Sequence, residues 1–216
     1  MNILYIILII LILNETKEED SIYNLRINHL KNPLGIDIRD NIFSFLSTEK
    51  GPFKATLLLG NEIIDSKEVF LNQSHSFYFK EPLEYNKTYK YIIESFSSKS
   101  ELEFETAIKL EAPFIKPNNK KIFCPIFLKD FDLSKKVKKG RLYITGLGLY
   151  VAYINEQKVG NAYLTPGYND YDYYLRYQTY DITELLKEKN KMEIHMGEGW
   201  YKGRFHWFNN TFGDEY

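Results

Sequence analysis

Apolar and polar residues alternate along most of the chain in the pattern of short β-strands. Residues 88–96 and 101–106 alternate apolar and polar side chains, as a strand with one buried face requires. Similar runs recur about every 8–12 residues between turn signals, which is typical of a β-sandwich. The pattern therefore predicts a first sandwich over residues 21–108. Its expected strands lie within residues 23–30, 41–46, 55–61, 75–79, 88–96 and 101–106.

A polar segment interrupts this pattern at residues 109–121. It contains Pro113 and Pro117 and ends in Asn-Asn-Lys-Lys, a composition that indicates a linker. We therefore expect a domain boundary in this segment.

Strand patterns resume after the linker and predict a second β domain over residues 122–216. The apolar runs lie within residues 122–133, 141–160 and 191–196. One short helix is expected at residues 181–189, where Asp181 can cap the first turn and Glu184 follows three positions later. The predicted fold class is all-β, with two sandwich-like domains and one short helix.

Composition supports the β assignment and excludes two classes of protein. Aromatic residues make up 16% of the chain, and aromatic side chains favour pleated sheet. The net charge is −1, from 28 basic and 29 acidic residues, so the basic excess that nucleic acids require is missing. An apolar content of 44% is ordinary for a globular protein and excludes a multi-span membrane protein. No nucleic-acid partner is expected.

The first 20 residues differ from the rest and predict an N-terminal leader. Residues 3–13 form an unbroken apolar run, shorter than the roughly 20 residues that span a bilayer and typical of a signal-peptide core. We interpret residues 1–20 as a signal peptide or apolar leader and expect a secreted or luminal protein. An uncleaved anchor and a buried apolar segment are the alternatives.

Asn-x-Ser/Thr sequences agree with secretion, because they are acceptors for N-glycosylation in secreted proteins. The candidate glycosylation sites are Asn72, Asn86 and Asn209, and Asn14 in the leader has the same pattern. Cys124 is the only cysteine, so no intrachain disulfide can form, and its apolar neighbours predict a buried thiol.

Four blocks follow one another in the second region. They are RLYITGLGLYVAYINEQKVG (141–160), YLTPGYNDYDYYLRYQTYDIT (163–183), the ELL turn, and MGEGWYKGR (196–204). In this order they resemble the N-terminal domain of bacterial-type α-L-rhamnosidases. The first region, through NPLGID (32–37), IDSKEV (64–69) and LEYNKTYKYIIES (83–95), is similar to the fibronectin-like module that precedes this domain. The resemblance implies a fibronectin-type-III-like sandwich at 21–108, followed by a truncated, jelly-roll-like domain at 122–216.

The chain departs from the family pattern at three places. Asn155-Glu156 stands where family members carry Asn-Gly, and a Glu at a turn position with positive φ costs roughly 1–2 kcal/mol. APFI (112–115) replaces an expected Trp-x-x-Trp-Ile entry into the second domain. The family's catalytic carboxylates, those of an inverting glycoside hydrolase, belong to a helical barrel that these 216 residues do not contain. The resemblance therefore implies a missing barrel partner, and no catalytic residue is assigned here.

Glu198, Trp200 and Tyr201 are the candidate ligand-binding residues. Gly197 and Gly199 flank Glu198, and glycine allows the backbone to approach a ligand closely. An exposed Trp can stack on the C–H face of a sugar. Packing inside the core or at an interface is the alternative interpretation of Trp200.

Asp170 and Asp172 would lie on the same side of an extended segment, where they suggest a carboxylate pair or a calcium site. No third acidic ligand accompanies them, so we interpret both as solvated loop acids. The seven tyrosines between Tyr163 and Tyr180 suit an adaptable interface as well as ordinary outer strand faces. No metal and no cofactor are expected.

The leading hypothesis is a secreted, non-catalytic N-terminal part of an α-L-rhamnosidase-like glycoside hydrolase that acts on rhamnose-containing glycans or glycosides. A carbohydrate ligand and the missing barrel domain are the expected partners. The alternatives are a separate secreted carbohydrate-binding or adhesive β protein and a gene fragment without a function of its own.

Overall fold

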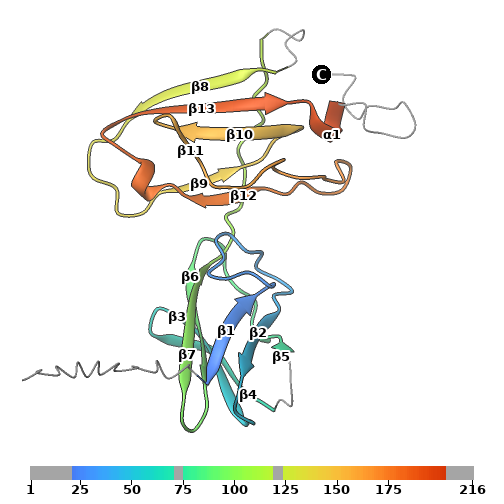
Figure 1. Ribbon diagram of the computed structural model, residues 1–216, viewed down its shortest axis with the longest axis vertical. Coiled ribbons are helices and arrows are strands. Elements are labelled where there is room, and N and C mark those ends of the chain that lie inside the picture. Colours follow the sequence, from blue (N-terminus) through green and yellow to red (C-terminus); the bar gives the residue numbers. More distant parts are fainter. Residues whose placement is uncertain (1–20, 71–74, 119–123, 203–216) are drawn as a thin grey trace, which may run out of the picture. The chain divides into compact units, whose positions relative to one another are not determined.

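The computed structural model describes residues 21–70, 75–118 and 124–202, and almost all regular secondary structure within them is β-strand (Figure 1). The predicted all-β fold class is therefore confirmed. Backbone contacts divide the chain into two compact units. The first unit comprises the described parts of Met1–Lys31, Asn41–Glu81 and Lys90–Glu103, and the second those of Asn32–Asp40, Pro82–Tyr89 and Phe104–Tyr216. The linker at residues 109–121 stays a prediction.

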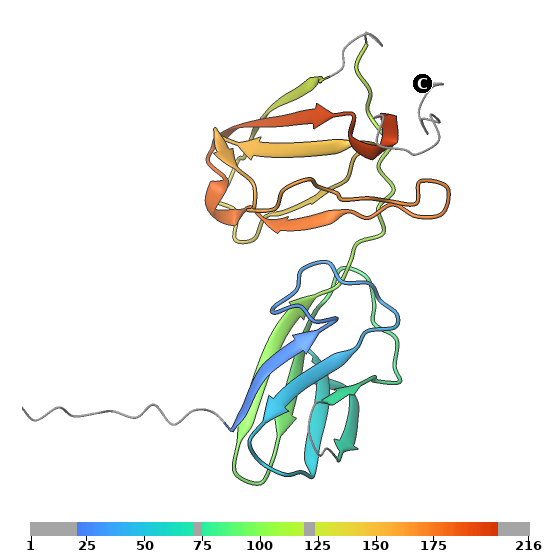
Figure 2. The same cartoon turned by 45° about the vertical axis from the view of Figure 1, so that its right-hand side comes forward.

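Strands β1 to β7 form a sandwich of two sheets, which Figure 2 shows facing each other. The strands are β1 (Ile22–Ile27), β2 (Phe43–Ser47), β3 (Phe53–Leu59), β4 (Glu62–Val69), β5 (His75–Phe77), β6 (Thr88–Glu94) and β7 (Lys99–Glu105). The strand orders are β1-β2-β5 and β4-β3-β6-β7. Phe43 and Phe45 of β2 are buried in alternation, whereas an irregularity in the pairing of β1 and three successive buried residues in β3 interrupt the simple pattern.

Aromatic rings fill the space between these two sheets. The ring of Phe43 meets Phe79 and Tyr91 edge-on, with centroids 4.8 and 5.2 Å apart, and Tyr89 stacks on Phe104 at 5.6 Å. Such pairs are worth about 0.5–1.5 kcal/mol beyond their buried area. The high Tyr and Phe content of the chain therefore contributes directly to this core.

Tyr91 is fully buried, and its hydroxyl has no hydrogen-bond partner within the described residues. Burial also raises the pKa of this hydroxyl, so the phenol stays neutral. We expect Tyr91→Phe to raise the free energy of unfolding by up to about 1 kcal/mol, because it removes an unsatisfied polar group at nearly constant volume. Urea unfolding would measure the change, and a loss of stability would reveal a hydrogen bond to the Tyr91 hydroxyl.

The second unit contains two further sheets. Its strands are β8 (Ile126–Asp132), β9 (Arg141–Ile144), β10 (Leu149–Ile154), β11 (Gln157–Lys158), β12 (Gln178–Asp181) and β13 (Lys189–Gly197). The strand orders are β11-β10-β13-β8 and β12-β9. Tyr150, Ala152 and Ile154 of β10 point into the core that Ile144 and Ile182 complete. The predicted β-rich second region is thus present.

Strand β8 stands at an edge of its sheet, and both of its faces carry exposed residues. Ile126 and Leu128 are 54% and 62% exposed. Cys124, just before this strand, is also exposed, so the prediction of a buried thiol is wrong. Apolar neighbours do not bury a side chain at the end of an edge strand, where only one neighbouring strand supplies contacts.

The turn expected at Asn155-Glu156 joins β10 to β11 in a hairpin. Both residues have positive φ, 51° and 69°, which is the conformation of the two-residue turn that suits strand twist. The Asn155 Nδ2 donates to the carbonyl of Leu185 at 2.8 Å and to Asn190 Oδ1 at 3.0 Å. These contacts hold a strained turn in place.

The helix predicted at residues 181–189 shortens to a 3-10 turn, Thr183–Leu185. The Asp181 carboxylate accepts hydrogen bonds from the N–H and hydroxyl of Thr183, but the N-cap residue of the turn is Ile182 rather than the expected Asp181. The Asn190 side chain, in contrast, bonds both the N–H and the carbonyl of Lys187, at 2.8 and 2.7 Å. This local pairing satisfies the backbone groups that a longer helix would use. The one α-helical turn of the described chain is α1 (Gly199–Lys202).

Three sequence predictions fall partly outside the described residues. The leader at residues 1–20, Asn72 and Asn209 lie there, so secretion and their glycosylation stay predictions. Asn86 is described, and it is exposed in a turn with a φ of 56°. In the described part of the chain, no helix has the length and apolar character needed to cross a bilayer.

Candidate functional site

Glu198, Trp200 and Tyr201 lie where β13 turns into α1. Gly148, with a φ of 119°, faces this turn so closely that a Cβ on it would stand 2.3 Å from the carbonyl oxygen of Gly197. The glycines of the GLG and GEG motifs thus let two backbone segments of the protein itself pack together. A Cβ on Gly197 would meet nothing within 4 Å, so this glycine, unlike Gly148, is not required by close packing.

Trp200 is half-buried, and its indole meets the ring of Tyr168 edge-on, with centroids 6.4 Å apart and an angle of 89°. Tyr168 is 53% exposed. Together they form an aromatic pair that is partly open to solvent, which is the feature a sugar-stacking site needs. Sequence reasoning did not single out Tyr168, which lies 32 positions before Trp200.

Tyr201, unlike Trp200, is buried and only 7% exposed. Its ring packs edge-on against Tyr171, with centroids 5.0 Å apart. Burial raises the pKa of the Tyr171 hydroxyl, with smaller contributions from Tyr168 and Tyr201, so this ring stays neutral. In this structure Tyr201 therefore supports the turn that carries Trp200.

Glu198 is half-buried, and its main-chain carbonyl accepts the N–H of Lys202 at 3.3 Å. An ionised carboxylate accepts hydrogen bonds through both of its oxygens, which is what a sugar hydroxyl requires of a partner.

The loop that carries Tyr168 is anchored by Asn169, a fully buried amide. Its Oδ1 accepts the N–H of Arg176 at 2.9 Å. The same loop is tied to the sheet by Thr165, whose hydroxyl donates to the carbonyl of Tyr150 at 2.8 Å. Tyr168 is therefore held in place from the interior rather than by contacts on the surface.

The seven tyrosines between Tyr163 and Tyr180 divide into two groups. The exposed members are Tyr163, Tyr168, Tyr173 and Tyr174, and the half-buried members are Tyr171, Tyr177 and Tyr180. Tyr163 precedes Tyr168, and Tyr173 and Tyr174 follow it, so exposed phenol rings occur along residues 163–174. The half-buried members agree with the packing interpretation, and an interface formed by the exposed members stays a prediction.

Asp170 and Asp172 differ in their surroundings. Asp170 is half-buried and its carbonyl accepts the N–H groups of Tyr173 and Tyr174, while Asp172 is exposed. No group of three or more His, Cys, Asp or Glu side chains that could hold a metal ion occurs among the described residues.

A charged cluster that the sequence did not reveal lies in the second unit. Arg141 donates from Nε and Nη2 to the two carboxylate oxygens of Glu105, at 2.9 and 2.7 Å, and from Nη1 to Asp181 at 2.8 Å. Lys139 also reaches Glu105, at 2.8 Å. The Arg141 and Glu105 side chains are only 14% and 12% exposed. Burial opposes ionisation of Glu105, but the bonds to Arg141 and Lys139 outweigh it and lower the pKa of the carboxyl.

Comparison with known proteins assigns the second region. Residues 135–216 match the family described as the α-L-rhamnosidase N-terminal domain. An α-L-rhamnosidase of Streptomyces avermitilis is 44% identical over 70 residues, which is 32% of this chain and 7% of that protein. One from Formosa agariphila is 34% identical over 87 residues, 40% of this chain and 9% of that protein. The matched segments thus cover less than a tenth of the length of these relatives.

Solved structures extend the likeness to most of the chain. The α-L-rhamnosidase from Dictyoglumus thermophilum superposes with a TM-score of 0.71 at 27% identity, over 84% of this chain and 25% of that one. The native enzyme from Aspergillus terreus gives a TM-score of 0.68 at 25% identity, over 88% of this chain and 25% of that one. The resemblance to the N-terminal region of α-L-rhamnosidases is confirmed.

Proposed function

We propose that this chain is the non-catalytic N-terminal part of an α-L-rhamnosidase-like glycoside hydrolase and that its second unit contacts rhamnose-containing glycans or glycosides. The observation that carries the proposal is the likeness of both units to one quarter of solved α-L-rhamnosidases, together with the match of residues 135–216 to their N-terminal domain.

The carboxyl groups support an accessory role. Inverting hydrolysis needs one carboxyl group with a raised pKa to act as the acid, opposite a second group that stays ionised. In the part of the chain that the structure describes, every carboxyl group with a displaced pKa is displaced downward: Glu49, Glu105, Asp181 and Glu193. These groups are stabilised as anions by hydrogen bonds and cations, which suits ion pairing rather than proton donation.

The aromatic pair of Trp200 and Tyr168 is the proposed sugar contact. A 6-deoxy sugar such as rhamnose presents a methyl group and a C–H face, and both lose water when they stack on an aromatic ring. Glu198 lies two positions before Trp200 in the chain and can accept a hydrogen bond from a sugar hydroxyl. Positioning of the ring by the buried Tyr201 lowers the cost of ordering the site.

The test is a titration of the purified full chain with L-rhamnose, followed through the backbone amide shifts of residues 197–202. We expect saturable binding that Trp200→Ala weakens about tenfold, or 1.4 kcal/mol, because the stacking surface is lost. Tyr78→Ala, which removes a 54% exposed ring from the other unit, should leave binding unchanged. Trp200→Phe is the conservative variant, and it tests whether the fold tolerates loss of the indole.

The same sample should release no aryl alcohol from an aryl α-L-rhamnoside. Saturable release that Glu198→Gln or Asp172→Asn abolishes would contradict the accessory role and place a catalytic site in the second unit. Binding that survives Trp200→Ala with an intact fold would remove Trp200 from the site.

A further inference from the structure

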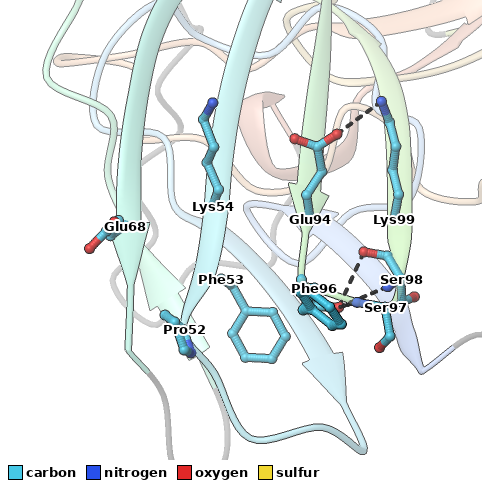
Figure 3. A pocket seen from close by; sticks show the side chains of 10 residues that line it. Pro52, Phe53, Lys54, Glu68, Glu94, Phe96, Ser97, Ser98 and Lys99 are labelled. Atoms are coloured by element: carbon cyan, nitrogen blue, oxygen red, sulfur yellow. Dashed lines mark hydrogen bonds and ion pairs between the residues drawn. The ribbon is translucent and has the colours of Figure 1, made fainter.

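The sandwich of the first unit carries a pocket of about 550 Å³ on the outer face of its four-stranded sheet (Figure 3). The β6–β7 turn forms one wall, and the adjoining ends of β3 and β4 form the other. A volume of this size matches small-molecule sites, which occupy about 300–1,000 Å³. The side chains that define the pocket are Phe53, Lys54, Glu68, Glu94, Phe96 and Lys99.

Phe96, at the tip of the β6–β7 turn, is completely exposed. Phe53 is buried and lines the same pocket (Figure 3). A fully hydrated phenyl group is unfavourable, and the tip of a turn has no structural need for it. A ligand that covers this ring would therefore gain free energy from its desolvation.

The turn that presents Phe96 is fixed by hydrogen bonds. Ser95 Oγ accepts the N–H groups of Ser97 and Ser98 at 3.2 and 2.9 Å, and the N–H of Ser95 donates to the carbonyl of Ser98 at 2.8 Å. Ser97 Oγ donates to the Glu49 carboxylate at 2.8 Å. The ring is thus presented on an ordered turn, which lowers the entropic cost of binding.

Four charges cross the sheet in a row of alternating sign, from Glu68 through Lys54 and Glu94 to Lys99 (Figure 3). Glu94 and Lys99 form an ion pair at 3.1 Å. Lys54 and Glu68 stand opposite each other in register, yet no ion pair joins them in the described structure. The pocket therefore holds a donor and an acceptor that are free for a ligand, and its charges sum to zero.

We propose that this pocket binds a neutral sugar unit, with the C–H face or methyl group of the sugar on Phe96 and its hydroxyls between Lys54 and Glu68. Balanced charge argues against an anionic or cationic ligand, since either would meet one repulsive pair. The polar row argues against an apolar peptide, which would leave these charges desolvated and unpaired. This proposal does not depend on the Trp200 site in the second unit.

Titration of the full chain with L-rhamnose and with cellobiose, followed by amide shifts, tests the proposal. At least one of these sugars should shift the amides of residues 94–99 saturably at millimolar concentration. Phe96→Ala should weaken binding about tenfold, equivalent to 1.4 kcal/mol. The double variant Lys54→Met/Glu68→Gln should weaken it several-fold. Phe70→Ala, which removes a 70% exposed ring outside the pocket, is the matched control and should bind as the unaltered chain does.

Three outcomes would overturn the proposal: no saturable shifts at residues 94–99 with either sugar, undiminished binding by Phe96→Ala, or equally strong binding of the anionic glucose 6-phosphate. Shifts confined to residues 197–202 would refute this pocket while leaving the proposed function intact. Shifts confined to residues 94–99 would support this pocket and contradict the sugar contact proposed at Trp200.

Discussion

Replacing Arg141 with methionine is expected to lower the free energy of unfolding of the second unit by about 3 kcal/mol. The substitution keeps an unbranched apolar stem but removes the cation that bonds both oxygens of Glu105 and one oxygen of Asp181. Glu105 is only 12% exposed, so its charge would stay away from water with Lys139 as its remaining partner. Arg141→Lys should restore little, because a single ammonium cannot bond both carboxylate oxygens as the guanidinium fork does.

The matched control is Lys90→Met, which breaks the pair of Lys90 and Glu101 at 3.0 Å. These side chains are 39% and 51% exposed, so the loss should stay below about 1 kcal/mol. Urea unfolding of both variants makes the comparison. Equal losses would show that the Arg141 cluster is no more than a surface ion pair.

The same cluster predicts how stability depends on pH. The pKa values of Glu105 and Asp181 are lowered in the folded chain, because Arg141 and their other partners outweigh the effect of burial. Their contribution is therefore complete above the ordinary carboxyl pKa of about 4 and is lost as the pH falls through the lower folded values. As the pH is lowered from neutral to acidic, the midpoint temperature of thermal unfolding should fall less steeply for Arg141→Met than for the unaltered chain.

Replacing Gly148 with alanine is the second change with a large expected effect, a loss of about 3 kcal/mol or more. The backbone there has a φ of 119°, which L-residues rarely adopt, and the new Cβ would stand 2.3 Å from the Gly197 carbonyl oxygen. Neither group can yield without moving β13 away from the start of β10. The turn that carries Trp200 should therefore be disturbed together with stability.

Substitutions at two other glycines separate the two causes of this loss, the positive φ of Gly148 and the close approach of the Gly197 carbonyl. Gly167→Ala, at a φ of 87° with nothing within 4 Å of its Cβ, tests backbone strain alone and should cost about 1–2 kcal/mol. Gly197→Ala, with open space around it and without a positive φ, should cost less than about 1 kcal/mol. Circular dichroism during urea unfolding ranks the three. A loss at Gly148 no larger than that at Gly167 would contradict the close approach of the two backbones.

Local patterns in the sequence predicted most of the strands. In a half-buried strand every second side chain faces the core, and this alternation is visible in consecutive residues. Strand β10 is an example: Tyr150, Ala152 and Ile154 face the core as the alternation requires. The positive φ of Glu156 also followed from its place in a two-residue turn. These features depend on residues close together in the chain.

Long-range contacts could not be predicted from the sequence, because they join residues that lie far apart in the chain and leave no local pattern. Glu105 and Arg141 are 36 positions apart, and nothing in either neighbourhood marks them as partners. Trp200 was recognised as a candidate, but its partner Tyr168 is one of many tyrosines and became distinctive only through the fold. The prediction of a helix over residues 181–189 was wrong for a similar reason. The side chain of Asn190, which lies in β13, bonds the backbone of Lys187 and replaces the hydrogen bonds of a longer helix.

The exposure of Cys124 has a chemical consequence. The chain has one thiol, and in the folded molecule that thiol is open to reagents. In an oxidising solution it can form a disulfide only with another molecule, so two copies of the chain, or the chain and a small thiol, would become covalently linked. In a reducing solution the same group is a single attachment point for a fluorophore or spin label, placed just before β8 and well separated along the sequence from Phe96 and Trp200.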